Sequence, residues 1–595
     1  MKLFQRKSRF FLLGTLWLFG ILLLVLDYLI PFRGALSYTQ FWTGILLCMI
    51  SALILLLDND FSCRGKVFVL FNWGATLYLP KVLRSPFFLN LQDELLHFQT
   101  LKLIYESGTL NITPTIFEVS KYYPGLELLT LPIKLVTNLS LFHTAILLIG
   151  FIQSLLPVFI FLIFKNITLS ERISALGAFI FTSNTSFFCL DSMFSYESLG
   201  IFFVVVLLLL IFKTSCTTEF QLFFSFLSLI VVTSLIITHH FSSYMFLSFS
   251  IILVAVQYYK NTTNKAITGY KSHIRFTLLT IISISAWLTY VATITINYLG
   301  GIFIDRIKHI VSFSILGEKR ELFWQSSLPV YEVFIGYLYI PLILLLSGFG
   351  IHYLHNKDKI QNIYVYSFIV YGPLLYCLSL LLIPTYSQDI ANRSWPFLFI
   401  GVSFVVAHSL DNVVRQRNFL IKIFTFIAVV LVMIGGISLG DNPSGRFLGS
   451  INLVSGPATI TSDVIYASNW FEEKNGRYNK IIGDSTIHWV FGGYGVQDAT
   501  TWEAWKVFFP KTINDTVIYT LKNYEIQYVI VDKRITEFLA KYKCYFNRVE
   551  LNIKKHPGYG RTKPLPKECI EKFDNSIFFT RVYSNDNIII YKINT

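Results

Sequence analysis

The chain has 595 residues, of which 54% are hydrophobic, 17% aromatic and only 14% charged. Soluble domains carry about 25% charged residues, so this composition excludes an ordinary soluble protein. The formal net charge is +14, which in a soluble protein would suggest nucleic-acid binding. We expect no nucleic-acid partner, because the basic residues are spread over short loops and do not cluster with aromatic residues.

Long apolar runs recur along the first three quarters of the sequence. Most have about 17–25 residues, enough to cross a hydrocarbon core about 30 Å thick. Within hydrocarbon every backbone N–H and C=O must be bonded inside its own segment, so the runs are predicted to be helices. We therefore predict a mainly α, polytopic membrane protein with about thirteen transmembrane helices. Their predicted ranges are 10–30, 39–57, 67–80, 141–164, 173–190, 199–212, 220–238, 241–259, 276–298, 328–353, 361–383, 395–409 and 419–439.

The loop charges predict the orientation of these helices. Loops on the same side as the N-terminus are rich in lysine and arginine and poor in acidic residues, with Arg9, Lys260, Arg275 and Arg415 among them. Such an excess marks cytoplasmic loops. The N-terminus is predicted to be cytoplasmic, and an odd number of spans then places the C-terminal region outside. The expected location is the plasma membrane.

The first long outer loop, residues 81–140, contains two predicted helices. Apolar residues recur at helical spacing over 93–105, which predicts a short amphipathic helix in the membrane interface, with Asp93 near its N-terminus. Pro124-Gly125 precedes a second predicted helix at 126–137.

The composition after Leu439 changes to that of a soluble α/β unit. We therefore predict two domains, a membrane domain at 1–440 and an extracytoplasmic α/β domain at 441–595. Runs of β-branched residues and turn residues indicate the strands. The predicted strands are 480–483, 528–531 and a closing hairpin at 577–583 and 588–591, and the predicted helices are 462–473 and 515–524.

Two cysteines lie in this outer domain, where oxidation is permitted. Cys544 and Cys569 are candidates for a disulfide, and the alternative is two buried thiols. No CxxC or similar metal-binding spacing occurs in the sequence.

Polar residues in the membrane domain gather at one side. No lysine or arginine lies in the middle of a predicted span, whereas ion-coupled transporters usually carry ionisable residues there. Polar side chains instead gather at the predicted outer ends of helices, which suits chemistry on a lipid-carried substrate. The residues are Asp93, Glu94, His97, Asp191, Tyr196, Glu197, His239, His240, Gln388, Asp389 and Arg393.

The motifs in this set resemble those of the GT-C glycosyltransferases, which include protein O-mannosyltransferases and aminoarabinose transferases. Asp93-Glu94 with His97-Phe98 is similar to their Asp-Glu signature on an outer loop, and the stretch 122–125 (YYPG) resembles the turn that follows it. Asp191 falls where many members place a second acid. The stretch 238–244 (THHFSSY) is similar to a His-Tyr motif in uncharacterised microbial members. The resemblance implies a polyprenyl-phosphate-linked sugar donor and a glycan, lipid or protein acceptor.

Such a transfer needs a carboxylate that accepts the acceptor proton and a positive charge at the departing phosphate. Asp93 is the candidate base, with Glu94 beside it. The substrate-binding candidates are His97, Asp191, Glu197, His239, His240, Gln388, Asp389 and Arg393. A divalent metal ion, Mg²⁺ or Mn²⁺, is compatible with the acids, although no ligand spacing demonstrates it.

Each assignment has a structural alternative. In the structural alternative, Asp93 only caps the N-terminus of its helix, and the negative charge of Glu94 interacts favourably with the helix dipole. Gln388, Asp389 and Arg393 would form only a local pair. At the level of function, the alternatives are a glycan polymerase or ligase, a transporter of lipid-linked glycans, and a noncatalytic membrane scaffold.

Overall fold

The structure, a computed structural model, describes residues 2–29, 35–216, 220–264, 270–316, 329–356, 362–383, 385, 388–416, 418–440, 446, 453, 459–540, 545–546 and 563–594. The chain forms two compact units. The bundle unit comprises Met1–Leu83 and Ala145–Pro443, and the sheet unit comprises Arg84–Thr144 and Ser444–Thr595. Most of the first long loop therefore belongs to the same unit as the C-terminal region.

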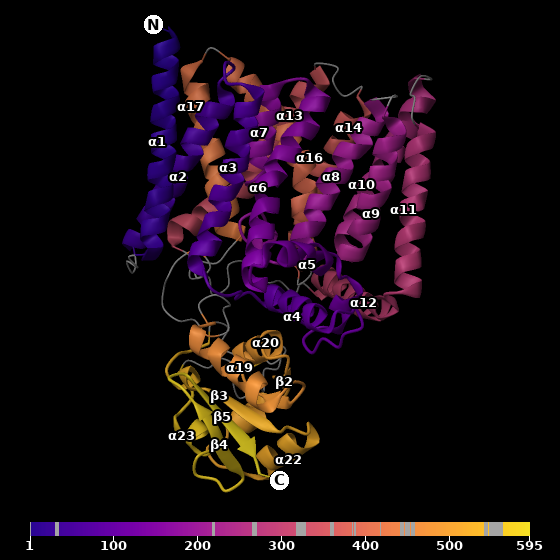
Figure 1. The fold of residues 1–595 in the computed structure, drawn as a ribbon. Helices are drawn as coiled ribbons and strands as arrows, with labels where there is room; N and C mark the ends of the chain where they lie inside the picture. The colour runs from indigo at the N-terminus through magenta and orange to yellow at the C-terminus, as the bar shows by residue number, and fades with distance from the viewer. Residues whose placement is uncertain are drawn as a thin grey trace. The chain divides into compact units, whose positions relative to one another are not determined.

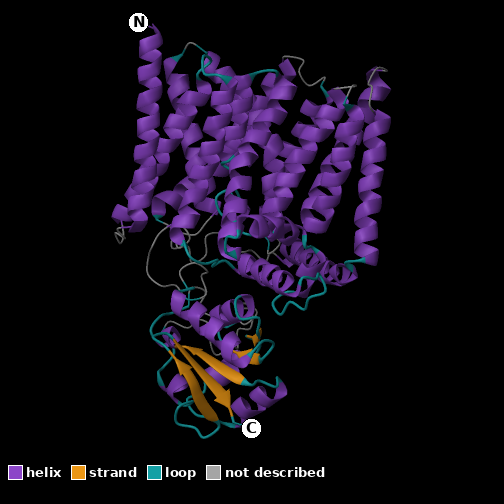
Figure 2. Cartoon of the chain, viewed as in Figure 1, coloured by secondary structure: helices purple, strands orange, loops and turns teal. Residues whose placement is uncertain are grey.

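Most helices of the bundle unit run side by side, whereas α12 is bent by 96° from α11 (Figures 1 and 2). In chain order these are α1 (Lys2–Leu29), α2 (Ala35–Leu57), α3 (Cys63–Arg84), α6 (Leu141–Thr168), α7 (Glu171–Phe181), η2 (Leu190–Ser192), α8 (Tyr196–Cys216), α9 (Gln221–Thr238), α10 (His240–Asn264), α11 (Tyr270–Tyr290), α12 (Thr293–Leu316), α13 (Val330–Asn356), α14 (Ile363–Ile369), η4 (Val370–Leu374), α15 (Leu375–Leu380), α16 (Gln388–Arg415) and α17 (Phe419–Gly440).

Ten helices among the described residues are long and apolar enough to cross a membrane, or 11 if the α11–α12 pair, bent by 96°, counts as one span. The chain is a multi-pass membrane protein. The sequence predicted about thirteen spans, and three of these ranges differ. Range 276–298 runs across the bend between α11 and α12. Range 67–80 lies in α3, which carries basic residues near both ends. Range 173–190 begins in α7, which has only 11 residues.

The early end of α7 has a local cause. Beyond Phe181 the side chains of Thr182, Ser183 and Asn184 each donate a hydrogen bond to a carbonyl three residues earlier. The Asn184 carboxamide oxygen also accepts from the backbone N–H groups of Ser186 and Phe187. Such bonds compete with the helical ladder, so the chain turns instead of continuing as a helix.

Helix α16 forms much of the buried core of the bundle, with nearly every residue from Ser394 to Asp411 buried. It is apolar around most of its circumference, as expected of a helix surrounded by others. Gly401 permits close packing against α14, since a Cβ atom there would lie 2.4 Å from the carbonyl oxygen of Phe368. Small residues at such contacts let helix backbones approach each other in membranes.

The sheet unit contains a five-stranded sheet of order β2-β1-β3-β5-β4. Strand β1 pairs in parallel with β2 and β3, whereas β5 pairs antiparallel with β3 and β4. The predicted strands, hairpin and flanking helices are confirmed, and the short strand β2 was not predicted. The elements are α4 (Gln92–Ser107), η1 (Glu118–Tyr122), α5 (Gly125–Thr137), α19 (Ser462–Asn475), β1 (Lys480–Ile482), α20 (Ser485–Gly493), β2 (Asp498–Thr500), α21 (Ala504–Phe508), α22 (Asp515–Asn523), β3 (Tyr528–Asp532), η5 (Lys533–Thr536), α23 (Glu568–Glu571), β4 (Phe579–Ser584) and β5 (Ile588–Ile593).

Helix α4 is packed into the sheet unit. The Phe98 and Tyr494 rings lie 5.1 Å apart, and the Gln99 side chain donates to the carbonyl oxygen of Gly492 at 2.8 Å. The Tyr494 hydroxyl accepts from the backbone N–H of Leu89 at 2.8 Å. The sequence predicted a helix in the membrane interface. Most of α4 is buried, and its predicted position in the membrane interface stays a prediction.

Candidate functional site

One end of the bundle unit brings together four segments that carry predicted site residues. They are the short helix η2, the first turn of α8, the junction of α9 with α10, and the beginning of α16. Each of these segments is a helix terminus, where the backbone leaves the bundle and polar side chains are tolerated.

Asp191 lies on η2 and is 1% exposed. Among the described residues, neither of its carboxylate oxygens has a hydrogen-bond partner. Burial and, to a smaller extent, the negative charge of Glu197 raise the pKa of Asp191 well above its usual range. Buried carboxylates are normally hydrogen-bonded, so an unpartnered one indicates a group kept for a ligand or a proton.

Glu197, in the first turn of α8, lies beside this carboxylate and forms an ion pair with Arg393 of α16. The Arg393 Nη1 atom is 3.2 Å from Glu197 Oε2. The Glu197 side chain is 8% exposed and that of Arg393 is 42% exposed. The ion pair therefore restrains one nitrogen of the Arg393 guanidinium group, while part of the side chain is exposed.

The α9–α10 junction positions two histidines. His239 has an extended backbone, which ends α9 and starts α10 at the next residue. Its buried ring stacks on Tyr196, with centroids 4.3 Å apart, and its Nδ1 atom lies 2.7 Å from the Ser242 hydroxyl. Gly200 makes this approach of α8 and α10 possible, since a Cβ atom there would collide with Ser242. The His240 ring lies 5.1 Å from that of His239.

The structure thus brings Asp191, Glu197, His239, His240 and Arg393 to one end of the bundle. Gly200 was not predicted, whereas Tyr196 was predicted only as a member of the polar set and Ser242 only as part of the stretch 238–244. The spacing of three residues between His239 and Ser242, one helical turn, was the available sequence signal.

Two other predicted residues at the start of α16, Asp389 and Gln388, do not share the contacts of this group. Asp389 is exposed and pairs with Arg306 at 3.1 Å, whereas Arg393 pairs with Glu197. Gln388 is half-buried at the first position of the helix. Asp389 and Arg393 therefore form ion pairs with different residues and not with each other.

The remaining predicted acids lie on α4 in the sheet unit. Glu94 is buried, and its Oε2 atom accepts from the backbone N–H groups of Asn90 and Leu91, each at 3.3 Å. Glu94 therefore stabilises the N-terminus of α4, and its catalytic role stays a prediction. The N-cap residue is Leu91, so Asp93 lies inside the first turn of the helix instead of capping it. Asp93 is half-buried.

His97 has a partner that the sequence did not indicate. Its Nδ1 atom lies 3.0 Å from Glu127 Oε1 on α5, and both side chains are buried. This contact joins the two helices of the first outer loop. Glu127 follows the Pro-Gly turn by two residues, which was the only sequence signal for its position.

The acids and histidines do not form a recognisable metal site. Within the described residues there is no group of three or more His, Cys, Asp or Glu side chains that could hold a metal ion. Asp191 and Glu197 alone do not supply a complete ligand set. The Mg²⁺ or Mn²⁺ ion stays a prediction.

The candidate disulfide also stays a prediction. Cys569 is buried, with its Sγ atom 3.3 Å from the carbonyl oxygen of Phe509. Cys544 lies outside the described residues.

Comparison with known proteins gives a match in structure only. No protein-family model matches the sequence, and no curated protein does so either. The apo structure of the oligosaccharyltransferase of Archaeoglobus fulgidus aligns with a TM-score of 0.58 over 89% of this chain and 80% of that chain, at 10% identity. The chain has the GT-C glycosyltransferase fold.

Two further structures share this fold. The same archaeal enzyme, AglB, in complex with an inhibitory peptide and a dolichol-phosphate has a TM-score of 0.51 at 10% identity, over 81% of this chain and 71% of that one. The arabinofuranosyltransferase AftD from Mycobacteria has a TM-score of 0.53 at 13% identity, over 89% of this chain. The match covers 42% of AftD.

Proposed function

We propose that the chain is a membrane glycosyltransferase that moves a sugar from a polyprenyl-phosphate-linked donor to a glycan, lipid or protein acceptor. The observation that carries the proposal is the buried Asp191 carboxylate without hydrogen-bond partners among the described residues, in a chain with the GT-C fold. The complex of the archaeal enzyme with a dolichol-phosphate supports a lipid-phosphate donor.

The reaction is a displacement at the anomeric carbon of the donor sugar. The acceptor attacks this carbon and loses a proton, while the lipid phosphate leaves with increased negative charge. Asp191 is suited to receive the proton, because burial raises its pKa and so makes its carboxylate a stronger base than an ordinary one. General-base help of this kind is worth about 10²–10⁴-fold in rate.

Arg393 is suited to bind the lipid phosphate. A guanidinium group binds phosphate through two parallel hydrogen bonds, and this one is 42% exposed. Glu197 contacts one nitrogen of this group and thereby restrains its orientation. The stacked His239 and Tyr196 rings, beside Glu197, support the first turn of α8.

Asp93 is the second candidate for the base. It lies on α4 of the sheet unit, whereas Asp191 belongs to the bundle unit. One structure of the archaeal enzyme is a complex with Zn and sulfate. The Mg²⁺ or Mn²⁺ ion stays a prediction for this chain.

The proposed location is the plasma membrane, with a cytoplasmic N-terminus and the transfer site at the extracytoplasmic face. The distribution of basic loops supports this orientation. On the same grounds, the C-terminal α/β domain of residues 441–595 is proposed to lie outside the cell.

The test is glycan transfer in membranes that carry the full chain at matched expression. We expect Asp191→Asn to lower the rate by about 10²-fold or more, because the amide accepts no proton. Asp93→Asn tests the second candidate in the same assay. The matched control is Asp305→Asn, which removes an exposed acid paired with Lys308.

Full activity in both Asp191→Asn and Asp93→Asn would overturn the proposed chemistry. That result would favour a transporter or a noncatalytic scaffold. A scaffold further predicts that removal of residues 441–595 abolishes function while both acids are dispensable.

A further inference from the structure

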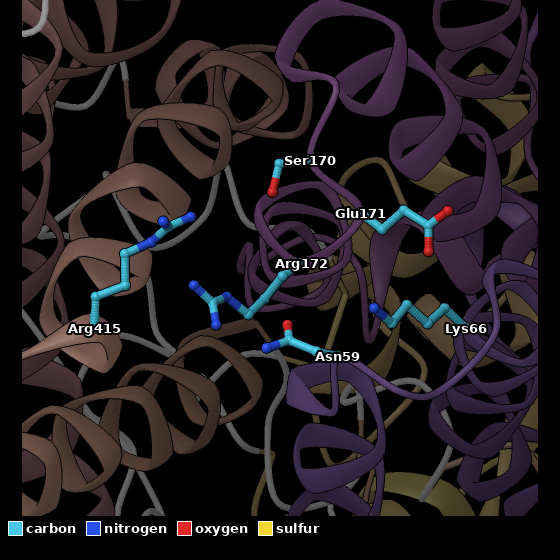
Figure 3. A pocket seen from close by; sticks show the side chains of 6 residues that line it. All are labelled: Asn59, Lys66, Ser170, Glu171, Arg172 and Arg415. Carbon is cyan, nitrogen blue, oxygen red and sulfur yellow. The ribbon is translucent and has the colours of Figure 1, made fainter.

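A polar cavity lies at the other end of the bundle unit (Figure 3). Its volume is about 430 Å³. It is bounded by the α2–α3 loop, the first turn of α3, the α6–α7 junction and the last turn of α16. The lining residues are Asn59, Lys66, Ser170, Glu171, Arg172 and Arg415.

Lys66 is the most unusual of these residues, because its side chain is almost completely enclosed, at 2% exposed. In Figure 3 its nitrogen points towards Asn59 and Arg172. Within the part of the chain that the structure describes, its ammonium group has neither a hydrogen bond nor an ion pair. Burial of an unpaired charge is costly, so this arrangement indicates that a negative ligand completes it.

The neighbouring carboxylates are already engaged. Arg172 and Arg415 share the single buried carboxylate of Asp411, at 2.6 and 2.8 Å. Glu171 pairs with Lys165 at 2.9 Å, and its carboxylate points away from Arg172 in Figure 3. The cavity lining therefore carries more positive than negative charge.

The helix α7 adds to this positive field. Ser170 is its N-cap, and Glu171 and Arg172 are its first residues, so the N-terminus of an 11-residue helix borders the cavity. The unbonded N–H groups and the dipole at a helix N-terminus favour an anion such as phosphate.

The cavity and the Asp191 site are separated by about the thickness of a membrane. Arg393 and Arg415 lie on the same helix, 22 positions apart, which corresponds to about 33 Å at 1.5 Å per residue. The hydrocarbon core is about 30 Å thick. Since Arg415 belongs to the loops predicted to be cytoplasmic, the cavity faces the cytoplasmic side.

We infer that this cavity is a second phosphate-binding site, which takes either the headgroup of an anionic lipid of the cytoplasmic leaflet or a soluble phosphate. Basic residues that only determine the orientation of the chain in the membrane are expected in exposed loops. Lys66 is enclosed, so that role alone does not explain its position. The site is independent of the proposed transfer reaction.

The experiment uses the full chain purified in detergent. Short-chain phosphatidylglycerol, short-chain phosphatidylcholine and inorganic phosphate are each titrated, and binding is followed by tryptophan fluorescence and by the shift in melting temperature. We expect saturable binding of phosphatidylglycerol that weakens about tenfold in Lys66→Gln, through loss of a charge-assisted contact. Arg415→Gln is a second variant, chosen because its side chain is 59% exposed and Asp411 keeps its ion pair with Arg172.

The matched control is Arg9→Gln, which removes a cation paired with Asp58 that does not line the cavity. Binding of phosphatidylglycerol that depends on Lys66 or Arg415 but not on Arg9 supports a lipid ligand. The same dependence for inorganic phosphate supports a soluble one. The inference is overturned if the folded wild type binds neither, or if Arg415→Gln and a folded Lys66→Gln bind as tightly as wild type.

Discussion

The side chain of Arg393 joins the beginning of α16 to the first turn of α8, where it contacts Glu197 at 3.2 Å. We expect Arg393→Gln to weaken donor binding about 10- to 100-fold, because a charged hydrogen bond to phosphate contributes about 1.5–3 kcal/mol. The measurement is the Michaelis constant for the lipid-linked donor. Lys308→Gln serves as the control, since Lys308 is 70% exposed and pairs with Asp305 instead. An unchanged Michaelis constant in Arg393→Gln would remove the phosphate contact from the mechanism.

The rate of transfer should also depend on pH through Asp191. Burial raises the pKa of Asp191. Its carboxylate therefore becomes protonated at a higher pH than that of an exposed aspartate, whose ordinary pKa is about 3.9. We expect the rate to fall as the pH is lowered through this raised value. The profile is recorded in membranes between pH 4 and pH 8 at about ambient temperature. If the rate fell only near the ordinary carboxyl range, Asp191 would not be the base.

Glu94→Ala should destabilise the sheet unit by about 1 kcal/mol, because it leaves the backbone N–H groups of Asn90 and Leu91 without this acceptor. Thermal unfolding of the purified chain measures the effect. Glu118→Ala, which removes an exposed ion pair with Lys121, should have a much smaller effect. Loss of transfer activity without loss of stability would instead support a catalytic role for Glu94.

Asp484→Asn should stabilise the sheet unit at alkaline pH. Asp484 caps α20 through Oδ1, while burial, and then the charge of Asp532, raises its pKa to about 7. The folded state therefore retains a proton that the unfolded state releases near pH 4, so stability is lost as the pH rises from about 4 to about 7. Asparagine keeps the cap and removes the charge.

The expected gain is on the order of 1–3 kcal/mol at pH 8 and close to zero at pH 4. It is measured as the difference in thermal unfolding between variant and wild type at the two pH values. Asp586→Asn, in the exposed hairpin turn, is the control. A gain of equal size at both pH values would contradict the assignment of the effect to ionisation.

Gly401→Ala should destabilise the bundle unit by about 1–3 kcal/mol. The added methyl group would meet the backbone carbonyl of Phe368, which has no alternative rotamer. Gly348→Ala is the control, because nothing lies within 4 Å of a Cβ atom at that position. Equal melting temperatures for the two variants would show that α14 and α16 pack less closely than described.

The apolar runs and the alternation of β-branched residues determined most of the secondary structure of this protein. A span such as Leu141–Thr168 is specified locally, because hydrocarbon requires a helix wherever a long apolar segment enters it. The strands that contain Ile481 and Val529 were likewise evident, since short β-branched runs between turns favour a buried sheet.

Only the tertiary structure decided how the polar residues are used. The sequence placed Glu94, His97 and Asp191 together in one candidate set, but each has a different environment: a helix N-terminus, a partner on α5, and a buried position without hydrogen bonds among the described residues. Such differences depend on contacts between segments far apart in the chain. Local sequence fixes which side chains are polar, whereas the free energy of burying them depends on what the fold places beside them.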